Sequence, residues 1–266
     1  MSITLITSAA PKLNNDKVVQ LTVIDGKLSK KEKVRYNKDG SVDKRHCNKV
    51  TGQDSEVYAF KTKEEIASMI KILNNHIEQA SDSDKRQIAC RNKMLFLIGI
   101  NVGIRGSDLR SLKWSFFLKE NGEFKDFYTL QPKKQRKQHK FVKLYFNQTV
   151  KKTIMDYVTE YPINNMDDYL FPSRKGDEPI TVSSLCRIIK DTANEAGIEQ
   201  NIGSHSLRKS WGFWCWHEAS DKNKALVVLQ QCFNHSSTQT TLKYIGLLDN
   251  EISDMYNSIE LGLDFI

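Results

Sequence analysis

The stretch KMLFLIGINVG, residues 93–103, limits the fold of this chain more than any other segment. It is apolar on nearly every side, so a helix here must be enclosed by other elements. Gly103 ends the stretch, and glycine readily adopts the left-handed backbone conformation that closes many helices. The segment therefore predicts a buried helix, around which the other elements build a core.

Helical signals lie on both sides of this segment. TKEE, residues 62–65, is a capping box, in which the Thr62 hydroxyl and the Glu65 carboxylate each accept from a free amide of the first turn. Apolar residues follow it at helical spacing. Further helices are expected from residue 104 onward and over 147–161, 181–196, 204–219, 222–232 and 236–246.

Two runs of a different kind interrupt the helical pattern. Residues 123–131 and 140–146 are rich in aromatic and β-branched side chains and flank a polar, strongly basic turn, which predicts a β-hairpin. A shorter strand and turn is expected within 18–28, where β-branched residues run into Asp-Gly. The expected fold class is therefore mainly α with a small antiparallel β-sheet or hairpin.

Composition narrows the class of protein. The 266 residues suffice for one large domain with an appendage, and 39% hydrophobic with 27% charged residues excludes a largely disordered chain. No apolar run approaches the roughly 18 residues of a membrane helix, and the start, MSITLITSAAPK, lacks the pattern of a signal peptide. The five unevenly spaced cysteines favour reduced thiols and a cytoplasmic location.

Charge and polarity divide the chain into three segments. The net charge of +8 attracts polyanions, most often nucleic acid. Residues 1–59 are basic and poor in large apolar side chains, so they form either a solvated tail or a DNA-binding arm. Residues 60–248 form the main domain, and 249–266 an acidic tail with an amphipathic helical pattern.

A series of residues with chemical potential runs through the main domain. Each has an ordinary explanation by itself, and a Tyr such as Tyr244 among apolar neighbours is most often a core residue. His205 and Arg208 are three apart on a predicted helix and share a face. Arg105 and Arg208 can together clamp a phosphodiester, since a guanidinium offers paired donors to phosphate oxygens.

The remaining members fit the same chemistry. Lys134 in the basic turn can protonate a leaving oxygen, and His235 can donate a hydrogen bond or pass a proton. Ionising a tyrosine with a pKa of about 10 at pH 7 costs roughly 4 kcal/mol, so an attacking Tyr244 requires a base or a cationic pocket. The other members supply that pocket without a metal ligand set.

This ordered series resembles that of the tyrosine recombinases, also called phage-type integrases. In that family an Arg follows a buried helix, as in GIRGSDL, a Lys sits in a β-hairpin, and H-x-x-R precedes a second His or Trp. A Tyr follows about nine residues later, as in HSSTQTTLKY. The resemblance covers residues 58–246.

The resemblance implies a role for each member of the series. Lys133 and Lys137 are close enough to Lys134 to exchange roles with it, and Asp108 is expected to be structural. DNA contacts are expected from the hairpin tip, at Lys133, Arg136, Lys137 and Lys140. The implied catalytic set is Tyr244 as nucleophile, Arg105 and Arg208 as phosphate clamp, Lys134 as general acid, and His205 with His235 as acid/base and hydrogen-bonding pair.

The resemblance also implies a reaction and partners. The enzyme would be a site-specific recombinase that cuts and rejoins double-stranded DNA through a 3′-phosphotyrosyl intermediate, in integration, excision, inversion or resolution. It needs neither metal nor other cofactor. Residues 60–248 would be the catalytic domain. The protein would act as a homotetramer on paired sites and be weakly associated or monomeric when free. The apolar stripe of the tail 249–266 either folds back on its own domain or, as the resemblance suggests, docks on a neighbouring subunit.

Two features depart from the family. Asn234 stands where relatives usually have Gly before the second His, and Asn tolerates the same backbone angles, so the turn is expected to survive. Most relatives also place a helical domain of about a hundred residues ahead of the catalytic domain. Here the short basic segment 1–59 stands in its place.

Other interpretations remain. A type IB topoisomerase uses nearly the same residues, and a DNA-binding accessory protein without activity is the alternative from another class. A zinc site of Cys215 and His217 with Cys232 and His235 fails because residues two apart on a helix point to nearly opposite sides. The aromatic residues near the H-x-x-R motif are expected to pack in the core: Trp211, Phe213, Trp214 and Trp216.

Overall fold

The chain divides into two compact units, residues 1–55 and 56–266. The computed structural model describes two short strands in the first unit and, in the second, residues 56–132, 141–174, 178–247, 256 and 258. In the first unit β1 (Leu21–Ile24) pairs antiparallel with β2 (Lys27–Lys30). The strand predicted ahead of Asp-Gly is thus confirmed as β1, and its partner β2 was not predicted.

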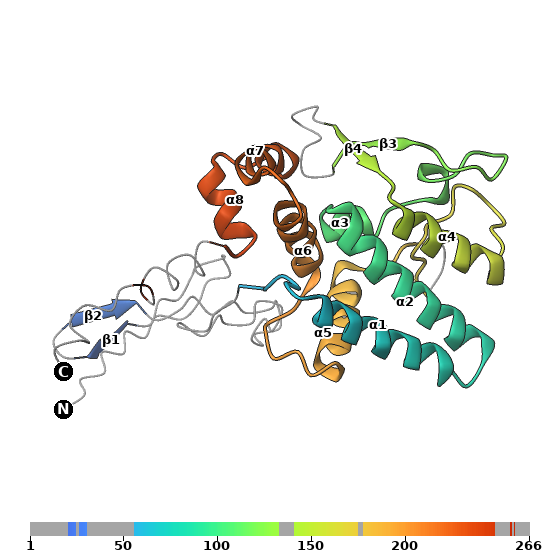
Figure 1. Cartoon of the computed structure of the whole chain (residues 1–266). Helices are drawn as coiled ribbons and strands as arrows, with labels where there is room; N and C mark the ends of the chain where they lie inside the picture. Colours follow the sequence, from blue (N-terminus) through green and yellow to red (C-terminus); the bar gives the residue numbers. More distant parts are fainter. Residues whose placement is uncertain are drawn as a thin grey trace, which may run out of the picture. The chain divides into compact units, whose positions relative to one another are not determined.

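The described part of the second unit is helical with one small sheet (Figure 1). This confirms the predicted fold class. The hairpin consists of β3 (Phe127–Leu130) and β4 (Val142–Tyr145), which pair antiparallel, and its predicted basic tip lies outside the described residues. The helices are α1 (Lys63–Glu78), α2 (Ser83–Val102), α3 (Gly106–Leu109), α4 (Gln148–Glu160), α5 (Val182–Glu195), α6 (Ser204–His217), α7 (Lys222–Phe233) and α8 (Thr238–Tyr244).

Helix α2 is the buried helix that the sequence predicted, and α1, α4 and α6 pack against it (Figure 1). It begins at Ser83 rather than at residue 93, because Asp82 caps its first turn by accepting from the amide of Lys85 at 2.8 Å. The first of the added turns, residues 83–87, is polar and exposed, so it lacks an apolar signal. Gly103 closes the helix in the left-handed conformation, with φ of 63°.

The helix expected from residue 104 onward is shorter than the pattern suggested. Helix α3 has only four residues, and a 3-10 turn, η1 (Trp114–Phe116), follows. Between them the backbone pairs with a distant segment: Leu170 donates to the Leu112 carbonyl at 2.9 Å, and Trp114 donates to the Asp168 carbonyl at 3.2 Å. These tertiary bonds replace the helical bonds that local spacing favoured.

Two hydrophobic clusters hold this unit together. The larger one surrounds α2, and the smaller one joins α6, α7 and α8 through Phe213, Leu229, Phe233 and Ile245. Trp211, Trp214 and Trp216 pack against the smaller cluster, so the predicted packing role of the aromatic residues around the H-x-x-R motif is confirmed. The smaller cluster therefore holds together the helices on or beside which His205, Arg208, His235 and Tyr244 lie.

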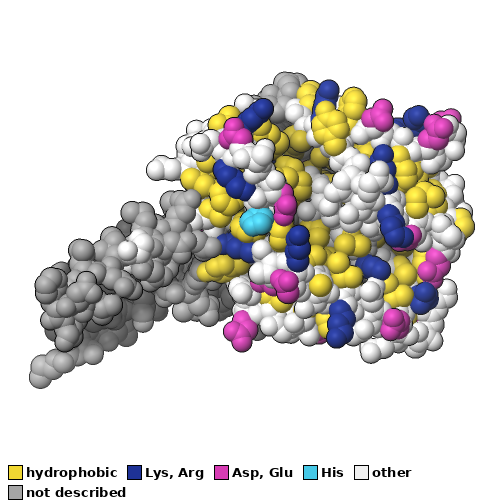
Figure 2. Space-filling model, viewed as in Figure 1, with side chains coloured by type: hydrophobic (Ala, Val, Ile, Leu, Met, Phe, Trp, Pro, Cys, Tyr) yellow, Lys and Arg dark blue, Asp and Glu magenta, His cyan; other side chains and the backbone are white. Residues whose placement is uncertain are grey.

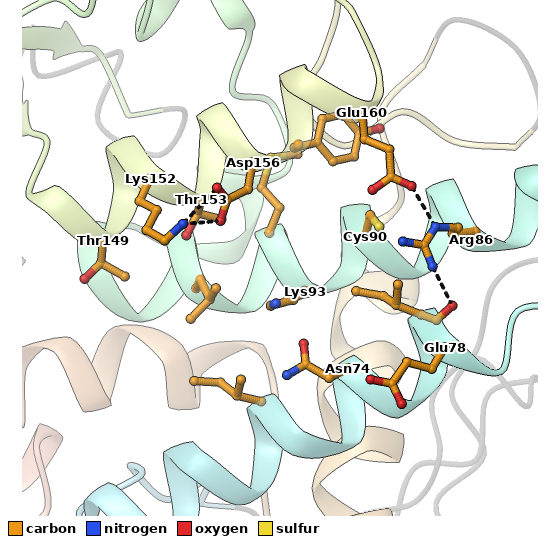
Figure 3. A pocket seen from close by; sticks show the side chains of 15 residues that line it. Asn74, Glu78, Arg86, Cys90, Lys93, Thr149, Lys152, Thr153, Asp156 and Glu160 are labelled. Atoms are coloured by element: carbon orange, nitrogen blue, oxygen red, sulfur yellow. Dashed lines mark hydrogen bonds and ion pairs between the residues drawn. The ribbon is translucent and has the colours of Figure 1, made fainter.

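A cavity of about 560 Å³ lies between α1, α2 and α4 (Figure 3). Its rim carries two ion pairs, Arg86 with Glu160 at 2.7 Å and Lys152 with Asp156 at 2.9 Å. None of the predicted site residues within the described part lines this cavity. The cavity is therefore separate from the candidate active site.

The surface of the described part has no strongly charged face in the view of Figure 2. Lys and Arg side chains alternate there with Asp and Glu side chains. Among the residues that the structure describes, no helix is both long enough and apolar enough to span a membrane.

Candidate active site

Arg105 is placed by the tight turn that ends α2. Gly103 has no room for a side chain, because a Cβ would lie 2.1 Å from the Trp211 ring. Ile104 is then buried, and Arg105, half-buried, takes the N-cap position of α3. Asp108 is buried one turn further on, and its amide donates to the Arg105 carbonyl at 2.8 Å.

Arg208 lies on α6 and is held rigidly, with only 7% of its surface exposed. Its guanidinium donates to the carbonyls of Gly103 and, at 3.4 Å, of Cys232, and it lies 4.5 Å from the centre of the Phe233 ring. Burial lowers the pKa of Arg208 to about 10; the Tyr244 oxygen opposes this effect and the charge of Arg105 reinforces it. Two arginines thus lie close enough to repel each other, an arrangement that an anion between them would stabilise.

His235 follows the end of α7. Asn234 adopts the left-handed conformation, with φ of 56° and ψ of 48°, which confirms the prediction that the turn survives without Gly. The amide of His235 then donates to the Gln230 carbonyl at 3.0 Å, and its Nδ1 lies 3.1 Å from the Thr241 hydroxyl. Burial lowers the pKa of His235, and the charges of Arg208 and Arg105 act in the same direction.

The hydrogen bonds of Thr241 indicate the tautomer of His235. The Thr241 hydroxyl is fully buried and also lies 3.3 Å from the Ser237 carbonyl, which can only accept. Since a hydroxyl has one proton, both contacts are satisfied when Thr241 donates to Ser237 and His235 Nδ1–H donates to Thr241. The Nε2 atom of a neutral His235 is then an acceptor.

Tyr244 is the last residue of α8, and its ring packs edge-on against Phe233 and His235, at centroid distances of 5.0 and 5.1 Å. Burial raises the pKa of Tyr244, while Arg208, through its charge and a hydrogen bond, and Arg105 act to lower it. The hydroxyl is therefore neutral at pH 7 in this arrangement, next to two cations that favour its ionised form.

The structure brings together four of the residues predicted for catalysis: Arg105, Arg208, His235 and Tyr244. They come from separate places in the sequence, and the helix ends near Gly103, Asn234 and Tyr244 determine where they meet. His205 is exposed and lies three residues before Arg208, at the start of α6. The hairpin residues of the prediction lie outside the described residues: Lys133, Lys134, Arg136, Lys137 and Lys140.

Sequence reasoning missed two residues that contact this group. Thr241 orients His235, as described above, and Lys209 places its ammonium 5.4 Å from the centre of the Tyr244 ring. Lys209 is almost fully buried, whereas lysines in proteins are mostly exposed. The residue type therefore gave no reason to predict a contact with Tyr244. For Thr241, the helical spacing to Tyr244 was the available signal.

The described residues contain no group of three or more His, Cys, Asp or Glu side chains placed to hold a metal ion. Cys215 and His217 both lie within α6, two positions apart on a regular helix. The geometric objection to a zinc site at these residues therefore applies to the folded chain.

Comparison with known proteins identifies the family. The model of the phage integrase family matches residues 60–251, and the chain belongs to that family. The chain is similar to a probable integrase/recombinase, YoeC, of Bacillus subtilis (strain 168), with 31% identity over 157 residues that cover 59% of this chain and 78% of YoeC. It is also similar to the tyrosine recombinase XerH of Campylobacter jejuni, with 28% identity over 188 residues that cover 70% of this chain and 47% of XerH.

Solved structures show the same fold. The crystal structure of the XerA recombinase superposes with a TM-score of 0.54 at 20% identity, over 78% of this chain and 64% of XerA. XerH bound to a palindromic difH substrate, in a post-cleavage complex, gives a TM-score of 0.52 at 21% identity, over 77% of this chain and 55% of XerH. The chain thus spans about half the length of XerH, and the predicted tyrosine recombinase catalytic domain is confirmed.

Family membership also confirms the class of activity. The chain is a tyrosine-type site-specific recombinase, as the ordered series of residues predicted. The individual roles of its residues are a separate question.

Proposed function

We propose that Tyr244 is the nucleophile of this recombinase and that Arg105 and Arg208 hold the scissile phosphate. The Tyr244 oxygen attacks phosphorus and the bond to the 5′ oxygen breaks, which leaves a 3′-phosphotyrosyl link and a free 5′-hydroxyl. The tyrosine proton passes to one of the histidines, His205 or His235, and Lys134 protonates the leaving oxygen. Attack of a 5′-hydroxyl on the link reverses these steps and joins the strands.

One observation carries this proposal: the Tyr244 hydroxyl hydrogen-bonds Arg208, and the charges of Arg208 and Arg105 both favour its ionised form. Burial opposes ionisation in the free protein, so the nucleophile is neutral there. A phosphodiester between Arg105 and Arg208 would be met by fixed donors that stabilise the negative charge developing on its oxygens. A tyrosine with a purely structural role would not need a buried arginine bonded to its hydroxyl and a second arginine nearby.

The proposed substrate is double-stranded DNA. A solved structure of an XerH recombinase, similar in fold to this chain, is described as bound to its palindromic difH substrate. The basic hairpin tip, including Lys133, Arg136, Lys137 and Lys140, would contact the DNA backbone, and binding should weaken steeply with added salt. We further propose that residues 1–59 act as a DNA-binding arm and that a homotetramer forms on paired sites in the cytoplasm.

Trapping of the covalent intermediate tests the proposal. A nicked suicide substrate, built from repeats that flank the gene, loses the short strand carrying the 5′-hydroxyl, so the adduct accumulates. The wild-type chain should form a DNA adduct that resists denaturing electrophoresis, and Tyr244→Phe should bind the same DNA without forming any. An adduct of undiminished yield in Tyr244→Phe would refute the assignment of the nucleophile.

A further inference from the structure

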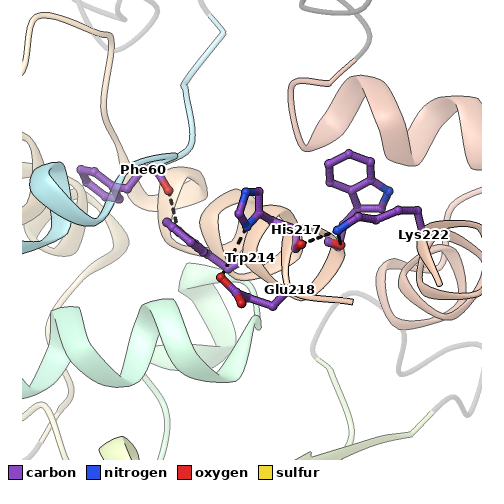
Figure 4. A network of polar contacts seen from close by, with 6 residues as sticks. Phe60, Trp214, His217, Glu218 and Lys222 are labelled. Atoms are coloured by element: carbon purple, nitrogen blue, oxygen red, sulfur yellow. Dashed lines mark hydrogen bonds and ion pairs between the residues drawn. The ribbon is translucent and has the colours of Figure 1, made fainter. Parts of the chain in front are cut away.

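Residues 56–61 cross α6 as an extended segment, which we call the strap. It follows directly on the N-terminal unit, residues 1–55. The amide of Tyr58 donates to the Asn201 carbonyl at 2.9 Å, just ahead of α6. Phe60 is bound at both backbone atoms, because its amide donates to the Ser210 hydroxyl at 2.7 Å and its carbonyl accepts from the Trp214 indole at 2.9 Å (Figure 4).

The strap also contacts the chain directly after Tyr244. The ammonium of Lys61 donates to the Gly246 carbonyl at 2.5 Å. Ala59 is buried in the same hydrophobic cluster as Ile245 and Leu247. The strap therefore binds both the helix that carries Arg208 and the turn that ends the tyrosine helix.

Lys209 connects the strap to the tyrosine ring itself. Its ammonium lies 2.6 Å from a carboxylate oxygen of Glu56, the first residue of the strap, and 5.4 Å from the centre of the Tyr244 ring. The side chain of Lys209 is 7% exposed and that of Glu56 is 40% exposed. The carboxylate therefore fixes the position of a nearly buried cation against the face of the ring.

We propose that Lys209 is a positioning residue for Tyr244 and that the strap, through Glu56, holds the Lys209 ammonium against the ring of the nucleophile. The proposal rests on the function assigned to Tyr244 above. The Glu56 carbonyl accepts from the Asn201 side chain at 2.8 Å, so the backbone of the strap is fixed where its carboxylate meets Lys209. Loss of the ion pair frees the Lys209 ammonium and, with it, one face of the tyrosine ring.

A purely structural ion pair would stabilise the fold without affecting the reaction. The distinction is measurable, because misplacement of a reacting group slows the chemical step while leaving substrate affinity intact. Glu160 provides a control for the carboxylate: its distance to Arg86 is 2.7 Å and its side chain is 42% exposed, close to the values for Glu56, but it pairs with an exposed cation at the remote cavity.

The test measures single-turnover formation of the covalent adduct at saturating protein, together with DNA affinity and the melting temperature. Glu56→Gln and Lys209→Met should each slow adduct formation by about tenfold to a hundredfold with unchanged DNA affinity. The double variant should be no slower than Lys209→Met, since both act through one contact. Lys209→Arg, which keeps the charge, should recover most of the rate, and Glu160→Gln should cleave like the wild type.

The outcomes separate this proposal from the assignment of Tyr244. If Tyr244→Phe abolishes the adduct while Glu56→Gln and Lys209→Met cleave at the wild-type rate, the nucleophile stands and the strap is only structural. If adduct formation by these variants slows only in proportion to a lower melting temperature, the strap is likewise only structural. If Lys209→Met does not fold, Glu56→Gln decides, because Glu56 is partly exposed and its amide keeps the shape of the side chain.

Discussion

Replacement of Arg208 by Lys keeps the positive charge in the site but removes the planar fork of the guanidinium. In the structure this fork donates to the Gly103 and Cys232 carbonyls, lies on the Phe233 ring and hydrogen-bonds Tyr244. An ammonium has three donors at one point and cannot reach separate backbone acceptors in these directions. Arg208→Lys should therefore lower both the free energy of unfolding and the rate of DNA cleavage.

The contacts of Arg208 set the expected magnitudes. A buried acceptor left without its partner costs about 1–3 kcal/mol, and the contact of the cation with the aromatic ring contributes about 0.5–2 kcal/mol. We expect Arg208→Lys to lower the free energy of unfolding by about 2–4 kcal/mol. Loss of a donor to the developing charge on phosphate should slow cleavage by about 10²–10³, with DNA binding preserved.

The assay needs a control that separates these two effects. Arg91 is equally buried, at 7% exposure, and donates to the Pro172 carbonyl at 2.6 Å, but it lies outside the site. Arg91→Lys should lose comparable stability in urea denaturation and still form the covalent adduct at the wild-type rate. All rates are measured at a temperature where both variants are fully folded.

Two results would contradict this reasoning. Cleavage by Arg208→Lys within a few fold of the wild type would show that the fork holds the fold together and does not act on the phosphate. An equal loss of cleavage in Arg91→Lys would show that the assay reports on stability rather than on the phosphate clamp.

Three further predictions concern the turns and the histidine of the site. The pKa of His235 is lower in the folded chain than its ordinary value of 6.5, so the unfolded chain takes up the proton first as the pH falls. The melting temperature should therefore decrease as the pH falls below about 6.5. The decrease should be smaller in His235→Gln, which has no titrating side chain at this position. Gly103→Ala should lower the free energy of unfolding by about 2–4 kcal/mol in urea, through backbone strain and collision with Trp211. Asn234→Ala should lower it by about 1 kcal/mol and Asn234→Gly should not, because only the alanine strains a left-handed turn.

The sequence by itself determined the local elements and most of the site. The capping box at Thr62, the helix end at Gly103 and the turn at Asn234 depend on residues close together in the chain, and each formed as predicted. The order of Arg105, the H-x-x-R motif and the later His and Tyr pointed to the family through its resemblance to the tyrosine recombinases, and the family match bears this out.

Only the tertiary structure decided which charges are buried and what holds the tyrosine. Local spacing favoured a helix from residue 104 onward, but it ends after four residues, where the backbone pairs with residues 168–170. Lys209 and Glu56 are 153 positions apart, and no local rule places a lysine in the interior. Burial and long-range pairing depend on how the helices pack against one another. Local patterns in a single sequence report on neighbours along the chain, so they do not predict which distant residues meet.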